Sequence, residues 1–139
     1  MTRELRNKNI LITGGAGFIG SHLSDALSNI PVGNLIVVDN LFVGLKENFT
    51  LLKNFKKFKF FNDDATDSNI LLHLIEEFQI EIVFNCATKP LNYSFINPKS
   101  AFDVNTQITL NLLELQRLNK FESLCHFSTS EVYGTSMMD

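Results

Sequence analysis

The sequence lacks the features that mark membrane, secreted and metal-binding proteins. No apolar run among the 139 residues reaches the ~18 that a membrane span needs, and no apolar segment follows the charged N-terminus as in a signal peptide. There are only two cysteines, Cys86 and Cys125, and both lie in apolar, strand-like runs, where reduced core thiols are more common than a disulfide or metal pair. The three histidines show no ligand spacing. We therefore expect a cytoplasmic protein with no metal site and no contact with a membrane.

The charge balance also excludes the basic surface typical of nucleic-acid-binding proteins. The formal net charge is −3, and 45% of the residues are hydrophobic, which suits one globular domain that buries about two-thirds of its unfolded surface. Segment 53–59 interleaves lysines with aromatics and superficially resembles such a surface. In an acidic chain, a solvated helix end that leads into a strand explains it better, so no nucleic-acid partner is expected.

Residues 10–20 organise the rest of the chain. A short apolar strand at 10–12 is followed by Gly14, Gly17 and Gly20 at intervals of three, and a helical apolar pattern starts at Phe18. Gly14 allows a tight turn, Gly17 lets a pyrophosphate approach the backbone, and Gly20 lets the helix pack close to the sheet. The helix N-terminus would hold the phosphates with its N–H groups and its partial positive charge.

Asp39 identifies the type of dinucleotide. It ends the apolar run 35–39, nineteen residues after Gly20, where an acidic residue accepts hydrogen bonds from the ribose hydroxyls. A 2′-phosphate about 4 Å from this carboxylate would cost roughly 4 kcal/mol at an effective dielectric of 20, and no arginine follows to offset it. We therefore predict NAD rather than NADP. The alternative is a tight turn in an ordinary α/β core with an unrelated strand-end aspartate; the strand, the helix and the acid together favour the dinucleotide.

The remaining pattern predicts an α/β fold: a Rossmann-type doubly wound parallel sheet with strand order 3-2-1-4-5 and helices on both faces. Five strands are expected, at 10–12, 35–39, 58–61, within 80–87 and at 124–127. The intervening helices are expected after the glycines, after Asp67 or Ser68, and over 101–118, preceded by a chain break at 97–98. Segment 40–48 reads as a loop over the adenosine ribose. On the first helix the apolar residues form one face, namely Phe18, Ile19, Leu23, Ala26, Leu27 and Ile30.

Helix 101–118 carries more apolar residues than one face needs. Those from Val104 to Leu118 follow a period near 3.6, and Leu110 and Leu113 widen the stripe. We therefore expect the second side of this helix to pack against a partner subunit, as in a homodimer. The alternative is a core helix covered on both sides.

Several motifs together resemble one known family. The chain is similar to the extended short-chain dehydrogenase/reductases, specifically the NAD-dependent nucleotide-sugar epimerases, dehydratases and decarboxylases. The segments that carry the likeness occur in family order, at 13–20, 38–41, 64–67, 97–98, 104–105, 109–113 and 128–134. They span nearly the whole chain, which makes the likeness far more specific than the glycines alone.

The resemblance implies a role for each matching position in holding NAD. Backbone amides of Phe18 and Ile19 would bind the pyrophosphate. Asp39 and Asn40 would hold the adenosine ribose, and Asp64 and Ala65 would hold the adenine. Cys86, Ala87 and Thr88 would line the cofactor. Asn105 would brace the long helix against the site.

The resemblance also implies two catalytic residues. Thr129 occupies the position whose hydroxyl hydrogen-bonds the sugar 4-hydroxyl or the keto group that it becomes. Glu131 stands where dehydratases and decarboxylases have a working acid, which tilts the expectation toward those reactions. The family's catalytic Tyr-x-x-x-Lys is missing, since Tyr93 is followed four residues on by Asn97 and Tyr133 by Met137. Tyr133 belongs to the strand-end signature and is expected to be structural.

We therefore expect residues 1–139 to be the NAD-binding Rossmann domain of a longer enzyme, cut off before the tyrosine–lysine pair and the substrate lobe. The parent enzyme would oxidise a nucleotide-linked hexose at C4, then epimerise, dehydrate or decarboxylate it. These residues alone are not expected to catalyse the reaction, because hydride transfer needs a base for the hydroxyl proton. The alternative is a non-catalytic NAD-binding module or scaffold that meets its partner through the long helix.

Overall fold

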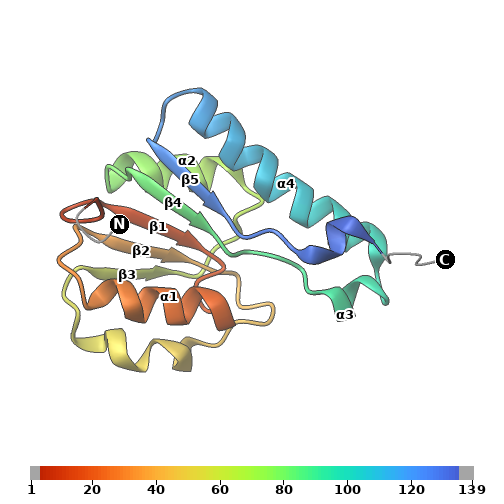
Figure 1. Cartoon of the computed structure of the whole chain (residues 1–139), viewed down its shortest axis with the longest axis horizontal. Helices are drawn as coiled ribbons and strands as arrows, with labels where there is room; N and C mark the ends of the chain where they lie inside the picture. Colours follow the sequence, from red (N-terminus) through yellow and green to blue (C-terminus); the bar gives the residue numbers. More distant parts are fainter. Residues whose placement is uncertain (1–3, 135–139) are drawn as a thin grey trace.

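A five-stranded parallel sheet forms the centre of the molecule. The computed structural model describes residues 4–134, except the side chains of Lys53, Asn54 and Glu131. Its strand order is β3-β2-β1-β4-β5, which confirms the predicted doubly wound fold (Figure 1). The strands are β1 (Ile10–Thr13), β2 (Leu35–Val38), β3 (Phe58–Phe61), β4 (Ile82–Asn85) and β5 (Ser123–His126). The helices are α1 (Phe18–Ser28), η1 (Lys46–Asn54), α2 (Ser68–Glu77), α3 (Leu91–Ser94), α4 (Pro98–Arg117) and η2 (Ser130–Tyr133).

Alternating side chains of the strands build two cores, one on each face of the sheet. Leu11 of β1 packs with α2 and α4, whereas its neighbours Ile10 and Ile12 pack with α1 and η1. All three side chains are fully buried, because β1 is the central strand and is covered on both faces. The carboxyl ends of β1, β2 and β4 therefore share one edge of a rigid layer.

Helix α1 packs through only part of the predicted face: Leu27 is buried, and Leu23 and Ile30 pack against the core. Phe18 and Ile19 are 80% and 49% exposed, and the buried residues of the helix include Ser21 and Ser24. Gly20 brings the helix so close to the glycine turn that only small side chains fit beneath it. The Ser24 hydroxyl donates to the carbonyl of Gly20 at 2.8 Å, so its burial leaves no unpaired hydroxyl.

Two helix starts differ from the sequence-based expectation. Segment 40–48 is only partly a loop, because η1 begins at Lys46 and buries Phe49 in the core. The expected break at 97–98 is instead the start of α4: the Asn97 side chain accepts from the Ser100 N–H at 3.0 Å, and Pro98 occupies the first turn. Asp67 caps α2 as predicted, accepting from the Asn69 N–H at 2.8 Å.

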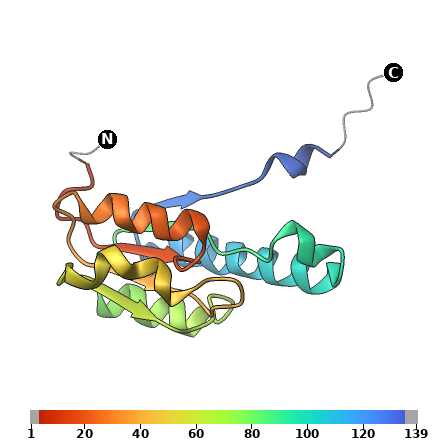
Figure 2. The ribbon, with the colours of Figure 1, turned by 90° about the horizontal axis from the view of Figure 1, so that it is seen from below.

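Strand β5 lies at the edge of the sheet, which corrects one of the two cysteine assignments. Cys125 is exposed rather than a core residue, whereas Cys86 is half-buried, and both are free thiols. In Figure 2 the chain runs away from the sheet after β5. Within residues 4–134 no helix is both long and apolar enough to cross a membrane.

Helix α4 has one buried and one exposed apolar side. Leu112 is fully buried under the sheet, while Leu110 and Leu113 are 54% and 48% exposed. The described residues of this chain therefore leave the second side of α4 uncovered.

The neighbouring leucines of α4 provide a matched test of this packing. We expect Leu112→Ala to lower the free energy of unfolding by about 2–5 kcal/mol, because it leaves a cavity in the core. Leu113→Ala should change it by less than about 0.5 kcal/mol. Urea denaturation of the two variants measures the difference, and equal losses would contradict this orientation of α4.

Candidate functional site

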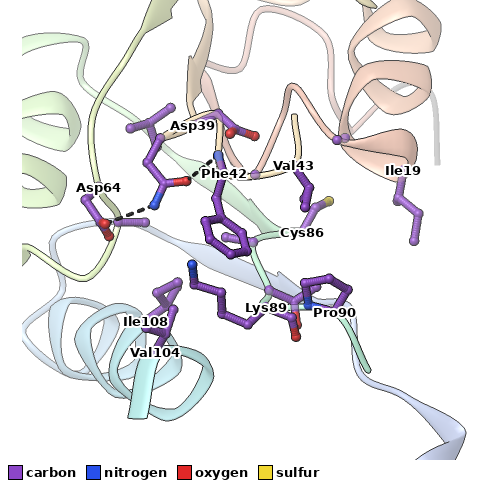
Figure 3. A pocket seen from close by; sticks show the side chains of 18 of the residues that line it. Ile19, Asp39, Phe42, Val43, Asp64, Cys86, Lys89, Pro90, Val104 and Ile108 are labelled. Atoms are coloured by element: carbon purple, nitrogen blue, oxygen red, sulfur yellow. Dashed lines mark hydrogen bonds between the residues drawn. The ribbon is translucent and has the colours of Figure 1, made fainter. Parts of the chain in front are cut away.

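A pocket of about 320 Å³ opens at the carboxyl ends of β1, β2 and β4. It lies where the strand order reverses, which is the usual ligand site of such sheets. Figure 3 shows side chains from both sides of β1 converging on it. Twelve of the thirteen residues predicted to hold a cofactor line this one pocket: Gly14, Gly17, Phe18, Ile19, Gly20, Asp39, Asn40, Asp64, Ala65, Cys86, Ala87 and Thr88.

The glycine turn forms a pocket floor that is made of backbone. Gly14 has φ +67° and donates its N–H to the carbonyl of Val38 at 2.9 Å. A Cβ on Gly14 would lie 2.5 Å from backbone atoms of Ala87, and one on Gly20 would lie 2.4 Å from the carbonyl oxygen of Gly14. No side chain caps α1 at Gly17, so the donor-rich end of the helix faces the pocket. A phosphate group would fit this arrangement.

Asp39 ties the glycine turn to the loop that follows β2. One carboxylate oxygen accepts from the N–H of Ala16 at 2.9 Å, and the other accepts from the N–H of Leu41 at 2.8 Å. The loop is fastened to the same turn farther along, because the N–H of Leu45 and the side-chain amide of Asn48 both donate to the carbonyl of Ala16, at 3.1 Å and 2.8 Å. The carboxylate is therefore held in a fixed position on the pocket wall.

Asp64 forms the second acidic wall of the pocket. Its carboxylate accepts from the N–H and hydroxyl of Thr66, at 2.8 Å and 2.7 Å, and from the side-chain amide of Asn40 at 2.9 Å. The carbonyl oxygen of that amide accepts from the N–H of Phe42 at 3.1 Å (Figure 3). Partial burial opposes ionisation of Asp64, but these hydrogen bonds and the charge of Lys89 outweigh it, so its pKa lies below the ordinary value.

The end of β4 is locked to its neighbours by a polar network that the sequence did not reveal. The hydroxyl of Thr13 donates to the side-chain oxygen of Asn85 at 2.6 Å, and the amide nitrogen of Asn85 lies 3.0 Å from Nδ1 of His126. Burial, together with the nearby Cys125, raises the pKa of Cys86 to about 12. Its thiol therefore stays protonated and is a wall of the pocket rather than a nucleophile.

Asn105 lies outside the pocket lining and acts on it from α4. Its side chain makes two hydrogen bonds to the backbone of Lys89: it accepts from the N–H at 2.7 Å and donates to the carbonyl at 3.2 Å. The structure thus places Asn105 where it braces the segment after β4. Eight further lining residues were not predicted from the sequence, namely Val38, Phe42, Val43, Asp63, Lys89, Pro90, Val104 and Ile108. Only their positions next to predicted site residues could have indicated them.

Of the two predicted catalytic residues, only Thr129 has a side chain in the described part of the chain, and it does not line this pocket. Thr129 follows β5, and Glu131 lies in η2. The neighbouring Tyr133 is 88% exposed, and Figure 2 shows this segment leading away from the sheet. In the described part of the chain, no group of three His, Cys, Asp or Glu side chains could hold a metal ion.

Comparison with known proteins agrees with this geometry. The model of the NAD dependent epimerase/dehydratase family matches residues 10–138. UDP-glucuronic acid decarboxylase 3 of Arabidopsis thaliana is 34% identical over 134 residues, covering 95% of this chain and 36% of that protein. UDP-glucuronic acid decarboxylase 1 of Danio rerio is 38% identical over 133 residues, covering 94% and 29%. The chain thus spans about a third of the length of these relatives.

Solved structures show the same likeness. The UDP-glucose 4-epimerase of Thermotoga maritima has a TM-score of 0.81 and 31% identity, covering 94% of this chain and 41% of its own. The dTDP-glucose 4,6-dehydratase of Bacillus anthracis, solved with NAD, has a TM-score of 0.77 and 29% identity, covering 95% and 41%. The family resemblance is confirmed, and NAD is confirmed as the cofactor at the level of the family.

Two glycines with the same backbone conformation test the pocket floor. Gly14 and Gly134 have φ +67° and +66°, but a Cβ on Gly134 would meet nothing within 4 Å. We expect Gly134→Ala to cost about 1 kcal/mol of stability or less, from backbone strain alone. Gly14→Ala adds the clash with Ala87 and should cost about 2–4 kcal/mol. Thermal unfolding measures both, and equal effects would contradict the close approach.

Asp64 predicts a pH-dependent contribution to stability. Its folded-state pKa is below the unfolded value, so its contribution is complete above about pH 5 and is lost as the pH falls through the folded value. In Asp64→Asn, an amide N–H group faces the amide N–H group of Asn40, so the hydrogen bond between the two side chains is lost. This should lower the free energy of unfolding by about 1 kcal/mol at pH 7, a small value because the site is partly solvated. Denaturation at pH 7 and at pH 3 should show that the stability difference between the parent chain and Asp64→Asn is smaller at pH 3. Asp63→Asn, an exposed neighbour, is the control, and a constant difference would contradict the prediction.

Proposed function

The chain belongs to the NAD-dependent epimerase/dehydratase family, and from this premise we propose that it is the cofactor-binding part of an enzyme acting on a nucleotide-linked sugar. One observation carries the proposal: residues that lie far apart in the sequence, predicted from glycine and acid spacing or from the family resemblance, line a single pocket at the switch point of the sheet. The nucleotide-sugar enzymes among the relatives and the solved structures support the substrate class.

The pocket fits the parts of NAD in the order that the motifs imply. The backbone floor at Gly14 and Gly17 and the uncapped end of α1 would hold the pyrophosphate. Asp39 and Asn40 would hold the adenosine ribose, with the adenine near Asp64. When bound, the cofactor supplies hydride acceptance; the residues of this chain bind and orient it.

Charge supports NAD rather than NADP. Asp39 is held by two backbone N–H groups, so its carboxylate cannot readily turn away from a 2′-phosphate at the ribose. Repulsion at about 4 Å is worth roughly 4 kcal/mol at an effective dielectric of 20. Hydroxyl groups at the same place would donate to the carboxylate instead.

The proposed chemical step involves residues that follow β5. We propose that Thr129 hydrogen-bonds the sugar C4 oxygen and that Glu131 acts as an acid in the parent enzyme. A tyrosine–lysine pair and a substrate lobe would come from sequence beyond these 139 residues, consistent with relatives about three times as long. The named relatives are decarboxylases, whereas the solved neighbours include an epimerase and a dehydratase.

The exposed side of α4 supports a homodimer in that enzyme. Leu110 and Leu113 present apolar surface that no other described part of the chain covers. The same exposed side also suits a second candidate function, a non-catalytic NAD-binding module that meets its partner through α4. Both candidates require the same cofactor site.

Calorimetric titration of the chain with NAD and with NADP tests that site. We expect NAD to bind, NADP to bind more weakly, and Asp39→Ala to weaken NAD binding by at least about tenfold, since the ribose loses its charged acceptor. Asp103→Ala, an exposed carboxylate on α4, is the control and should leave binding unchanged. A folded chain that binds no NAD, or that binds NADP equally well, would contradict the proposal.

A further inference from the structure

Three side chains meet at the pocket, and two of them, Phe42 and Lys89, line it. Nζ of Lys89 lies 2.8 Å from the ring centroid of Phe42 and 5.0 Å from that of Tyr93. The two rings meet edge to face, with centroids 5.0 Å apart. We call this group, Phe42, Lys89 and Tyr93, the clasp.

The clasp joins two walls that the sheet keeps apart. Phe42 belongs to the loop after β2, whereas Lys89 and Tyr93 follow β4, and β1 lies between these strands. The contact therefore joins segments from the two sides of β1 at the pocket that both Phe42 and Lys89 line. Figure 3 shows the Lys89 side chain extending past the ring of Phe42 toward Asp64.

Both walls are anchored at their bases. Asp39 and Ala16 hold the ends of the Phe42 loop, and Asn105 holds the backbone of Lys89. Phe42 at the loop apex is 46% exposed, so it is not held by core packing. An ammonium group over an aromatic face is attracted by the ring quadrupole, and this attraction is strong where water is partly excluded.

We propose that Lys89 and Phe42 are positioning residues that close the pocket and control how fast the cofactor enters and leaves. This rests on the proposed NAD site. Phe42 and Lys89 line the pocket, and a space of about 320 Å³ remains there while they are in contact. A dinucleotide would exchange when the clasp opens. Loss of the clasp should speed both association and dissociation, and equilibrium affinity should change less than either rate.

If Lys89 instead contacted the cofactor phosphates directly, the association and dissociation rates would change in a different way. In that case, removing the charge would speed dissociation without speeding association, and Phe42 would not influence the effect. Single and double variants separate the two, because side chains that act through each other have non-additive effects.

The clasp has a signature in the chain without any ligand. The ε-methylene protons of Lys89 lie over the ring of Phe42, so their NMR resonances should be shifted upfield from those of the other lysines. Phe42→Leu removes the ring and should abolish the shift. An unshifted Lys89 resonance in the parent chain would overturn the clasp, whatever the outcome of NAD binding.

Stopped-flow exchange of NAD then tests the proposed role. We expect Lys89→Met and Phe42→Leu each to raise the association and dissociation rate constants by roughly three- to tenfold. The double variant should be no faster than the faster single one. Lys89→Arg, which can also stack on the rings, should restore slow exchange. Lys99→Met, on exposed α4, is the control.

Two kinetic results would overturn the clasp: additive effects in the double variant, or faster dissociation with unchanged association. Failure of the parent chain to bind NAD would instead overturn the proposed function, and the NMR shift would still decide whether the clasp exists.

Discussion

The close approach of the glycine turn to the end of β4 determines the rest of the site. Only glycine allows the backbone at residue 14 to lie against Ala87, and only glycine at residue 20 allows α1 to begin directly over that turn. The floor of the pocket is consequently backbone, and the N-terminus of α1 points into it. The same approach leaves Phe18 and Ile19 outside the core, although their spacing suits a buried helical face.

This constraint also explains which parts of the structure the sequence could predict. The strands were predictable because continuous apolar runs mark strands buried on both faces, and the site because glycine and acid spacing reflects local backbone geometry. The exposure of Phe18 and Ile19 on α1 was not, because a tertiary contact at Gly20 overrides apolar periodicity at the start of the helix. Cys125 was misplaced for a similar reason: its run is apolar, but β5 is an edge strand.

Long-range polar contacts were beyond sequence reasoning. Thr13, Asn85 and His126 come from three strands, and no local pattern indicates that their side chains meet. Lys89 likewise has no distinctive sequence context, yet it contacts a ring from the loop after β2. These contacts connect the strand ends and the loops above them, so they shape the pocket as much as the motif residues do. Site prediction from motifs therefore finds the ligand-facing backbone and carboxylates better than the side chains that hold them.

The pocket has an acidic part and a positive part. The carboxylates of Asp39 and Asp64 lie after β2 and β3, while the positive end of α1 lies at the glycine turn after β1. A ligand that is anionic in its middle and carries neutral hydroxyl groups at one end matches this order. Reversing the order would set phosphate against carboxylate. Because Asp39 is hydrogen-bonded to Ala16 of the turn itself, the acidic and the positive parts of the pocket are held by one piece of backbone. Their spacing is therefore fixed by the fold before any ligand binds.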